Sequence, residues 1–583
     1  MDSQEVSNDN TTSVAGTNRV EQPDFAVRGL ELHSNDRFQT GMWRWKILGR
    51  AFRLMEQLEL NALIFHEVDL PDWLVYPRAY FTDEMMHSRW PVRRENVENA
   101  KAHLREVARR ASRQGVRFFL EVKEISFPSE LTELYPGLME IDGVVCPTHP
   151  FWWEYERTKY RELLEDIPDL AGVIVSPGTR ESKLSFAAHA CTCERCRSYK
   201  ASDWYANILR AMYEPLHARG KLLIVRDFTY SRSEQNLIVD ACSEVSKDIV
   251  VALKATPHDF YPTFPDNPRI GHTNGLPQWV EWDAWCQFAG MGFFPVSIVE
   301  NTQHRLRYCK RNNVTGVWFR ADLETVSESS IFNSLTMVNM FAGGMLARKI
   351  EQDLDSIYRA WLTYGVADPM KSESEQSEPV SVRPEDMDRF QAFMKASWSV
   401  MEKTLYVRGL NFNDGSCQFP NSVDRAFYNM LVLHGREDWE PGSSKRVDPT
   451  EENLKVIFAE KEQAEREVVR LPGILRPQEA QLPAELRASL LTILELYQQY
   501  VRGFRHCVVA CFTARKAAGS LAAADVEAAR RAADELAAYR REMAGRLKNT
   551  CYPHYIYSFF ALERLDLLIA DVRQKMAAIV GKP

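Results

Sequence analysis

The chain has 583 residues, of which 45% are hydrophobic and 26% charged, and its formal net charge is −8. This length predicts two or three domains, and the acidic balance argues against a general nucleic-acid binder, which normally carries a basic stripe. The sequence contains no run of the roughly 18 apolar residues that a membrane span needs, so neither nucleic acid nor a membrane is an expected partner.

Residues 1–24 are polar and contain no apolar stretch of the kind found in secretory signals. We expect a disordered tail there. Eleven cysteines are scattered along the chain, which is not typical of a disulfide framework. Together these features predict a cytoplasmic protein with reduced thiols.

Short runs of β-branched and aromatic residues alternate with helical patterns over residues 25–365. This alternation predicts βα units and a parallel sheet. Eight such units favour a closed (β/α)8 barrel over a doubly wound open sheet, because no glycine-rich phosphate loop follows the first strand. The expected strands are 26–34, 61–68, 115–125, 171–177, 221–229, 247–256, 276–283 and 314–322, and helical spacing is clear in 42–59, 93–113, 152–166 and 199–219.

Strand patterns stop after the barrel segment. Residues 366–382 are rich in Ser, Glu and Pro and predict a loop or linker. Residues 383–583 predict an all-α helical domain. The expected helices are 383–404, 450–468, 484–517, 522–548 and 554–579, with irregular stretches at 409–424 and 436–449.

Polar side chains are concentrated at the carboxyl ends of the expected strands, where the reactive groups of a (β/α)8 barrel stand. Carboxylates facing one another between aromatic walls suit glycoside cleavage. Salt bridges at the barrel rim would explain the presence of any one charged residue at a strand end. Burying all of the charged residues named below without a function would be costly in free energy. The polar set is His33, His66, Glu67, Glu124, Glu181, Arg226, Asp227, Lys254, His258, Asp259, Glu281, Asp283, Arg320 and Asp322, and the aromatic set is Trp73, Phe127, Phe228, Tyr230, Phe260, Tyr261, Trp282 and Trp318.

Several segments resemble glycoside hydrolase family 67, the α-glucuronidases, in the same order along the chain. They are GVRFFLEVKEISFPSEL (115–131), residues 146–184, LIVRDFTY (223–230), KATPHDFYP (254–262) and VEWDAWCQFAG (280–290). The resemblance implies that Glu181 is the general acid and that Asp259 and Glu281 activate water in an inverting mechanism. It also implies that Arg226 pairs with the carboxylate of the sugar. For the helical region 383–583 it implies a homodimer contact, and the alternative is a domain that serves only to cover the barrel helices.

The chain departs from that family in two respects. It begins close to the first strand, without the family's N-terminal β-sandwich, and Ser176 stands where the family has a lysine. We expect Lys254, Arg180, His258 and Trp282 to complete the substrate-binding site.

The predicted function is that of an inverting, exo-acting, α-glucuronidase-like hydrolase of uronic-acid-containing oligosaccharides. One alternative is a barrel of the same type acting on a neutral or N-acetylated sugar. A hexosaminidase-like site would need an adjacent Asp-Glu pair, which GTRES (178–182) lacks. A third alternative is a non-catalytic carbohydrate-binding barrel.

HACTCERC (189–196) places His189, Cys191, Cys193 and Cys196 in the loop after the fourth strand. Structural zinc sites normally draw on two separated pairs of ligands, and this cluster has no partner CxxC. Reduced loop cysteines are therefore expected, with a metal clip or a labile disulfide as alternatives. No metal or cofactor is assigned to the catalytic site.

Overall fold

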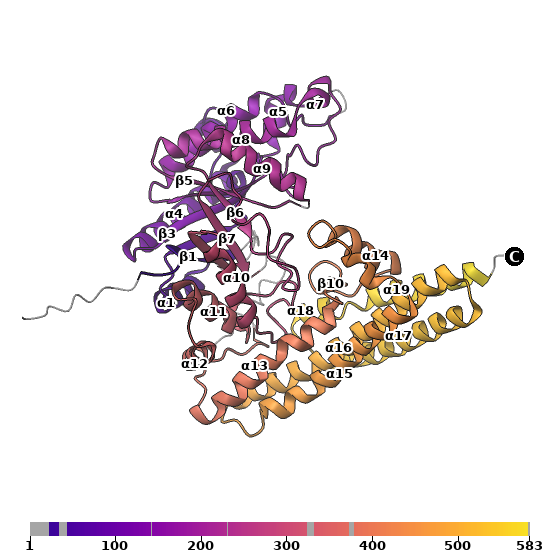
Figure 1. Cartoon of the computed structure of the whole chain (residues 1–583). Helices are drawn as coiled ribbons and strands as arrows, with labels where there is room; N and C mark the ends of the chain where they lie inside the picture. The colour runs from indigo at the N-terminus through magenta and orange to yellow at the C-terminus, as the bar shows by residue number, and fades with distance from the viewer. Residues whose placement is uncertain are drawn as a thin grey trace, which may run out of the picture.

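The computed structural model describes residues 22–33, 43–140, 143–229, 231–322, 331–371 and 378–580. Eight parallel strands form a closed barrel in which neighbours follow chain order, as the sequence predicts (Figure 1). The strands are β1 (Val27–His33), β2 (Ala62–His66), β3 (Arg117–Glu124), β4 (Gly172–Pro177), β5 (Leu222–Arg226), β6 (Val250–Lys254), β7 (Gln278–Asp283) and β8 (Gly316–Arg320).

Helices cover the outside of the barrel and include the four expected from the sequence. Those four are α1 (Trp45–Gln57), α4 (Pro91–Arg113), α6 (Phe151–Asp166) and α8 (Ala201–His217). The others are α2 (Leu70–Trp73), α3 (Asp83–Ser88), α5 (Glu130–Leu134), η1 (Pro136–Leu138), α7 (Glu194–Ser198), α9 (Arg232–Val245), α10 (Val299–Arg311), η3 (Ile331–Asn333), α11 (Met337–Arg348) and α12 (Leu354–Tyr364).

The connection between β6 and β7 differs from the expected βα pattern. Residues 255–277, all of which are described, form bends and turns and no helix. This segment contains Pro257, Pro262, Pro265 and Pro268. Each proline removes a backbone donor and clashes with the preceding turn of a helix, so the expectation of a helix in every unit is wrong here.

The inward-facing side chains of the barrel change from apolar to polar along each strand. Gly29 gives room to Trp318, because a Cβ at Gly29 would lie 2.6 Å from the Trp318 Cβ. Alternation along a strand places every second residue on the same face, so the residues two positions after this apolar layer also point inward. The apolar layer consists of Val27, Ala62, Ile64, Phe119, Ile174, Ile224, Val250, Ala252, Trp279 and Trp318.

The C-terminal region is mostly helical, and Figure 1 shows its long helices lying side by side next to the barrel. The expected helix 554–579 is divided into two at Phe560 and Ala561, which are both buried. The elements are α13 (Pro384–Leu405), β9 (Tyr406–Val407), β10 (Leu410–Asn411), α14 (Val423–Tyr428), η4 (Asn429–Leu433), η5 (Ser443–Val447), α15 (Glu451–Leu475), α16 (Ala484–Ser520), α17 (Ala523–Asn549), α18 (His554–Phe559) and α19 (Leu562–Val580).

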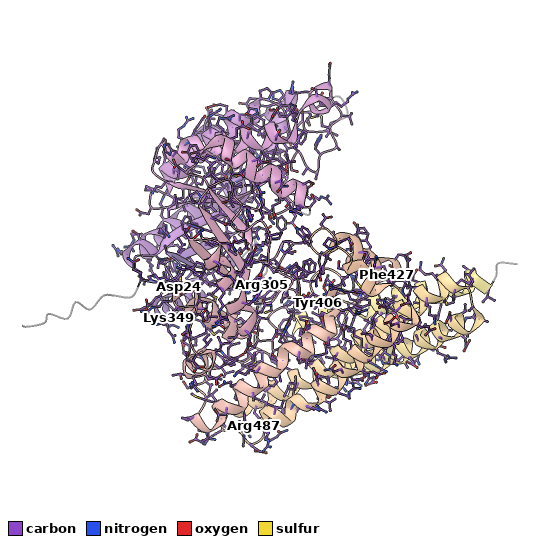
Figure 2. All side chains as sticks on the ribbon, viewed as in Figure 1. Asp24, Arg305, Lys349, Tyr406, Phe427 and Arg487 are labelled. Atoms are coloured by element: carbon purple, nitrogen blue, oxygen red, sulfur yellow. The ribbon has the colours of Figure 1, made fainter. Side chains whose placement is uncertain are left out.

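The helical region packs on the loop that follows β7. The Phe294 ring stacks on Tyr497 and Tyr500 of α16, with centroid distances of 5.0 and 4.5 Å. The Tyr406 hydroxyl, labelled in Figure 2, donates to the carbonyl of Phe288 at 2.7 Å. Because this loop leaves the carboxyl end of β7, the helical region lies against that side of the barrel mouth.

Residues at the edges of the expected tail and linker are tied to the barrel. The Asp24 amide donates to the carbonyl of Arg348 at 2.9 Å, and its carboxylate accepts from the Ile350 amide at 2.8 Å. Val366 and Val380 pair as an antiparallel bridge. The remainder of the tail, residues 1–21, and the middle of the linker, residues 372–377, lie outside the described residues.

Among the helices that the structure describes, none combines the length and apolar character needed to cross a membrane.

Candidate active site

A ring of buried polar side chains lies directly above the apolar layer of the barrel. Every strand contributes one residue, two positions after its apolar or glycine residue in the layer below. Burying charged groups is costly unless they are paired, so the contacts within this ring decide what it can do. The ring consists of Glu31, His66, Glu121, Ser176, Arg226, Lys254, Glu281 and Arg320.

On the β1–β3 side, His66 lies between two carboxylates. Its Nδ1 is 2.8 Å from Glu31 Oε1 and 2.9 Å from Glu121 Oε2. Burial alone would lower the pKa of His66, but the charges of Glu121 and Glu31 raise it above the ordinary histidine value. Trp318 Nε1 donates to Glu31 at 2.5 Å, and Arg320 Nε lies 3.3 Å from the same carboxylate. His66 therefore serves as a buried cation.

On the opposite side, Arg226 is held by protein groups. Its Nε and Nη2 contact the two oxygens of Glu281 at 2.5 and 2.8 Å. Its Nη1 lies 3.2 Å from Glu121 and 3.4 Å from the Ser176 hydroxyl. The resemblance implied that Arg226 binds the carboxylate of the substrate. In this structure the Nε and Nη2 donors of Arg226 are already bonded to Glu281.

Glu281 belongs to the same buried pair. Its side chain has no exposed surface, and burial raises its pKa although the Arg226 charge opposes the rise. Glu281 is not among the residues that line the two cavities described below. Its buried position is better suited to orienting Arg226 than to contacting bulk water.

Asp259 lies closer to the mouth, just after β6. Lys254 Nζ is 3.0 Å from its Oδ1, and 21% of its side chain is exposed. Burial would raise the pKa of Asp259, but Lys254 and His258 outweigh it and lower the value to about 2. Asp259 also has a φ of 47°, a left-handed conformation that is uncommon outside glycine and is often found at functional sites. The Asp259 carboxylate is therefore held ionised in a constrained position.

Glu181 lies in a polar cavity of about 660 Å³. It follows β4, and 49% of its side chain is exposed. Its Oε2 is 2.5 Å from Lys123 Nζ, and Glu67 after β2 contacts the same ammonium. The cavity is lined by Glu67, Val68, Asp69, Asp72, Trp73, Arg93, Lys123, Ser126, Ser129, Glu130, Glu181 and Lys183.

A larger cavity of about 1030 Å³ adjoins the polar one, because Asp72, Trp73 and Arg93 line both. Its walls are rich in aromatic residues. Sequence reasoning singled out only Trp73, because the other tryptophans stand away from the strand ends; the dense spacing of tryptophans over residues 43–90 was the available signal. The aromatic lining residues are Trp43, Trp45, Trp73, Tyr76 and Trp90.

Other residues expected at the site lie elsewhere. Trp282 points away from the barrel interior, because its neighbours Glu281 and Asp283 point inward, and its Nε1 donates to Thr302 of α10 at 3.3 Å. Trp282 therefore does not share the inward face of the barrel with Glu281, and its contact with substrate remains a prediction. Arg180 is exposed and lines neither cavity, and Tyr230 lies outside the described residues.

His258 joins the barrel to the helical region. It is buried, and its ring stacks on Trp439 with a centroid distance of 6.0 Å. Its Nε2 is 3.4 Å from His434 Nδ1, and the Tyr261 hydroxyl is 2.6 Å from the same nitrogen. Burial lowers the pKa of His258 to about 4 and that of His434 to about 3. In this packed position His258 is a contact between domains and not a group that faces either cavity.

The cysteine cluster has a member that the sequence pattern did not indicate. Cys146, from the loop between β3 and α6, lies with Cys191, Cys193 and Cys196, whereas His189 is not part of the group.

No protein-family model matches the sequence, and no curated protein matches it. Among solved structures, the chain is similar to a GH138 enzyme targeting pectin rhamnogalacturonan II, with a TM-score of 0.63 and 13% identity over 91% of this chain. The chain spans 63% of the length of that enzyme.

Two further solved structures are similar at lower scores. A Clostridium perfringens GH89 enzyme in complex with GlcNAc-α-1,4-galactose has a TM-score of 0.49 and 10% identity, over 96% of this chain and 64% of that one. A GH115 4-O-methyl-α-glucuronidase with specificity for decorated arabinogalactans has a TM-score of 0.43 and 12% identity, over 95% and 62%. At these identities, it is the likeness to the GH138 enzyme that supports the barrel fold, and a fold alone does not define a function.

Replacing Glu281 by Gln should destabilise the protein by about 3–5 kcal/mol, because it leaves the Arg226 charge buried without its carboxylate. Urea unfolding followed by tryptophan fluorescence would measure the change. The matched control is Glu542→Gln, which removes an ion pair of Arg502 at the surface and should cost at most about 1 kcal/mol. Equal losses in the two variants would show that the ring does not depend on this pair.

The stability of the protein should fall as the pH drops from 6.5 toward 4. His258 and His434 have folded pKa values below 6.5, so their contribution is complete above the unfolded pKa and is lost as pH falls through the folded values. The loss amounts to up to about 1.4 kcal/mol per pH unit for each group. In His434→Gln the acid dependence of stability should be flatter than in wild type. An unaltered profile in this variant contradicts this account.

Proposed function

We propose that the chain is a glycoside hydrolase whose oligosaccharide substrate lies across the two adjoining cavities. The observation that carries this proposal is the half-exposed Glu181 in a polar cavity that opens onto a cavity walled by tryptophans. Sugars offer hydroxyl groups to carboxylates and flat C–H faces to aromatic rings, and glycoside cleavage needs carboxyl groups beside the bond. The likeness of the barrel to that of a glycoside hydrolase is consistent with this function.

In this proposal Glu181 is the general acid. The ionised Asp259, which lies outside the lining of both cavities but is 21% exposed, is the carboxylate that activates water. The cations that pair with these two carboxylates both lie near Phe228, whose ring centroid is 5.5 Å from Lys123 Nζ and 4.3 Å from Lys254 Nζ. These distances to one centroid keep the two ammonium groups within 9.8 Å of each other. The two carboxylates are thus attached to neighbouring cations at the floor of the mouth.

Glu281 has a different role from the one the resemblance implied. It holds Arg226, and Arg226 also contacts Glu121 and Ser176. We assign Glu281 and Arg226 as positioning residues that fix the floor beneath Lys254 and Asp259, and not as groups that contact the substrate.

The charge of the polar cavity favours a neutral sugar. Its lining includes five acidic side chains and three basic ones, Arg93, Lys123 and Lys183, which leaves two negative charges in excess. A uronate would meet net repulsion there, and Arg226 is already paired. The α-glucuronidase-like activity is the second candidate, supported by the presence of those three cations in the cavity.

Glu181→Gln should reduce kcat on glycosides with poor leaving groups by roughly 10²–10⁴-fold. It should affect substrates with activated aryl leaving groups far less, because these depart without a proton. Glu67→Gln is the matched control, since Glu67 lines the same cavity and contacts the same lysine. Equal losses on both substrate types would remove Glu181 from the role of acid, and the selective pattern in Glu67→Gln would transfer the role to Glu67.

Asp259→Asn should abolish hydrolysis of activated and unactivated substrates alike. Proton NMR of fresh wild-type product should show an inverted anomer, because water attacks from the side opposite the acid when the carboxyl groups are roughly 6.5–9.5 Å apart. A retained anomer would contradict the assignment of Asp259 as a base that activates water.

A panel of aryl glycosides paired with the matching aryl uronides would test the charge of the substrate. We expect higher kcat/KM on the neutral member of the hydrolysed pair. Preference for the uronide would instead support the second candidate, and Lys183→Met should then lower kcat/KM for the uronide alone. Failure to hydrolyse any member of a broad panel would count against a hydrolase.

A further inference from the structure

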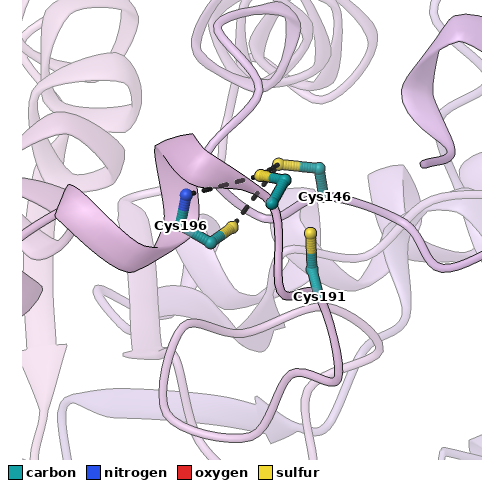
Figure 3. A group of neighbouring side chains, drawn as sticks. Cys146, Cys191 and Cys196 are labelled. Carbon is teal, nitrogen blue, oxygen red and sulfur yellow. Dashed lines mark hydrogen bonds between the residues drawn. The ribbon is translucent and has the colours of Figure 1, made fainter. Parts of the chain in front are cut away.

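Four cysteines from two separate loops converge beside the barrel mouth (Figure 3). Cys146 lies in the loop between β3 and α6, and Cys191, Cys193 and Cys196 lie in the loop after β4. The Cys146 sulfur is 3.7 Å from that of Cys193 and 3.6 Å from that of Cys196. All four sulfurs lie within 4.8 Å of one another.

This cluster is separate from the main hydrophobic core. Its buried members are Cys146, Cys191 and Cys196, and the partly buried hydrophobic residues that pack against them, within the described part of the chain, are Val144 and Cys193. A single valine and four thiols provide little apolar surface to hold two long loops together. Hydrophobic packing is therefore a weak explanation for their convergence.

We propose that these four cysteines bind one Zn²⁺ ion as thiolates, in a closed structural site. With Zn–S bonds of about 2.3 Å, a tetrahedral tetrathiolate places its sulfurs about 3.8 Å apart, and the measured separations of 3.6 and 3.7 Å are close to that edge. The Cys193-x-x-Cys196 pair has the spacing common in zinc sites. On binding, each thiol gives up its proton to water.

The surroundings of the sulfurs suit thiolates. The Cys196 amide donates to the Cys193 sulfur at 3.4 Å. The Thr148 hydroxyl lies 3.3 Å from both Cys146 and Cys196. Such donors outside the ligand set orient metal ligands and stabilise their charge.

The backbone of the Cys146 loop is fixed by two buried tryptophans. Trp152 Nε1 donates to the Cys146 carbonyl at 2.8 Å, and Trp204 Nε1 donates to the Pro147 carbonyl at 2.9 Å. Because these bonds come from α6 and α8, the first ligand is positioned by the barrel itself. The β4 loop then needs only to bring its three cysteines to that point.

The zinc would join the two loops that border the polar cavity. The β3 loop contributes Ser126, Ser129 and Glu130 to the lining, and the β4 loop contributes Glu181 and Lys183. The cysteines themselves do not line the cavity, and four protein ligands leave no position for substrate. The ion would thus stiffen the loop that carries Glu181, and the proposal does not depend on the hydrolase assignment.

Metal content of the full-length protein tests the site directly. The protein is purified under reducing conditions without chelators, and zinc is measured by inductively coupled plasma mass spectrometry. We expect one zinc per chain in wild type and in Cys551→Ser, which alters an exposed cysteine outside the cluster. Cys193→Ser should lose most of the metal, whereas Cys193→His should retain it, because histidine is also a zinc ligand.

Cys193 is the least buried of the four, so its substitutions are the least disruptive to folding. As a second measurement on wild type, titration with an organomercurial should release zinc in step with modification of the cluster, detected by a chromogenic chelator. Reconstitution of the metal-free protein with Co²⁺ should give the sulfur-to-cobalt charge-transfer absorption of a tetrahedral thiolate site.

Several results would overturn the proposal. They are a zinc-free wild type with freely alkylated thiols, a disulfide between cluster cysteines in the reduced preparation, a stoichiometric metal other than zinc, or full zinc retention by Cys193→Ser.

Discussion

The ion network inside the barrel is the constraint on which the rest of the mouth depends. Three carboxylates, Glu31, Glu121 and Glu281, alternate with the cations of His66, Arg226 and Arg320. The charges balance only if His66 is protonated, which agrees with its raised pKa. Because the members are buried and each is ion-paired with at least one other, loss of one leaves an uncompensated charge. The network therefore fixes the upper ends of the strands and determines which groups remain available for a ligand.

In the proposed hydrolase, substrate recognition would therefore depend on the layer above this network and on the loops. On the β7 side, the helical region packs on the loop containing Phe288 and Phe294 and encloses His258 against His434. On the β1–β4 side, the loops form the two cavities. The asymmetry explains why Asp259 lies at the edge of the open part of the mouth, whereas Glu181 lies within it. A sugar chain would enter along the tryptophan-rich side and end near Phe228.

Local patterns in the sequence were sufficient to predict the barrel but not the contacts between side chains of different strands. Strands appear in the sequence as short runs of β-branched and aromatic residues, and all eight were found at the expected places. Alternation along β7 would also have excluded Trp282, since it cannot share a face with Glu281. The pairing of Arg226 with Glu281 and Glu121 joins β5 to two other strands, and it could be recognised only when the closure and register of the barrel were known. Three tryptophans of the larger cavity, Trp43, Trp45 and Trp90, were missed because they do not stand at the carboxyl ends of strands.

The cysteine cluster is a second feature that local sequence patterns could not predict in full. HACTCERC (189–196) predicted reduced loop cysteines, because it has no partner CxxC. The fourth cysteine of the cluster is 45 residues before Cys191 in the sequence, at Cys146. Parallel strands bring consecutive βα loops together at one end of a barrel, so ligands from the β3 and β4 loops can meet without any local signal. A zinc ion there and the helical region on the β7 side would restrain opposite parts of the mouth. The loop that carries Glu181 would then be held by metal coordination, whereas Asp259 is held by packing and by its ion pair with Lys254.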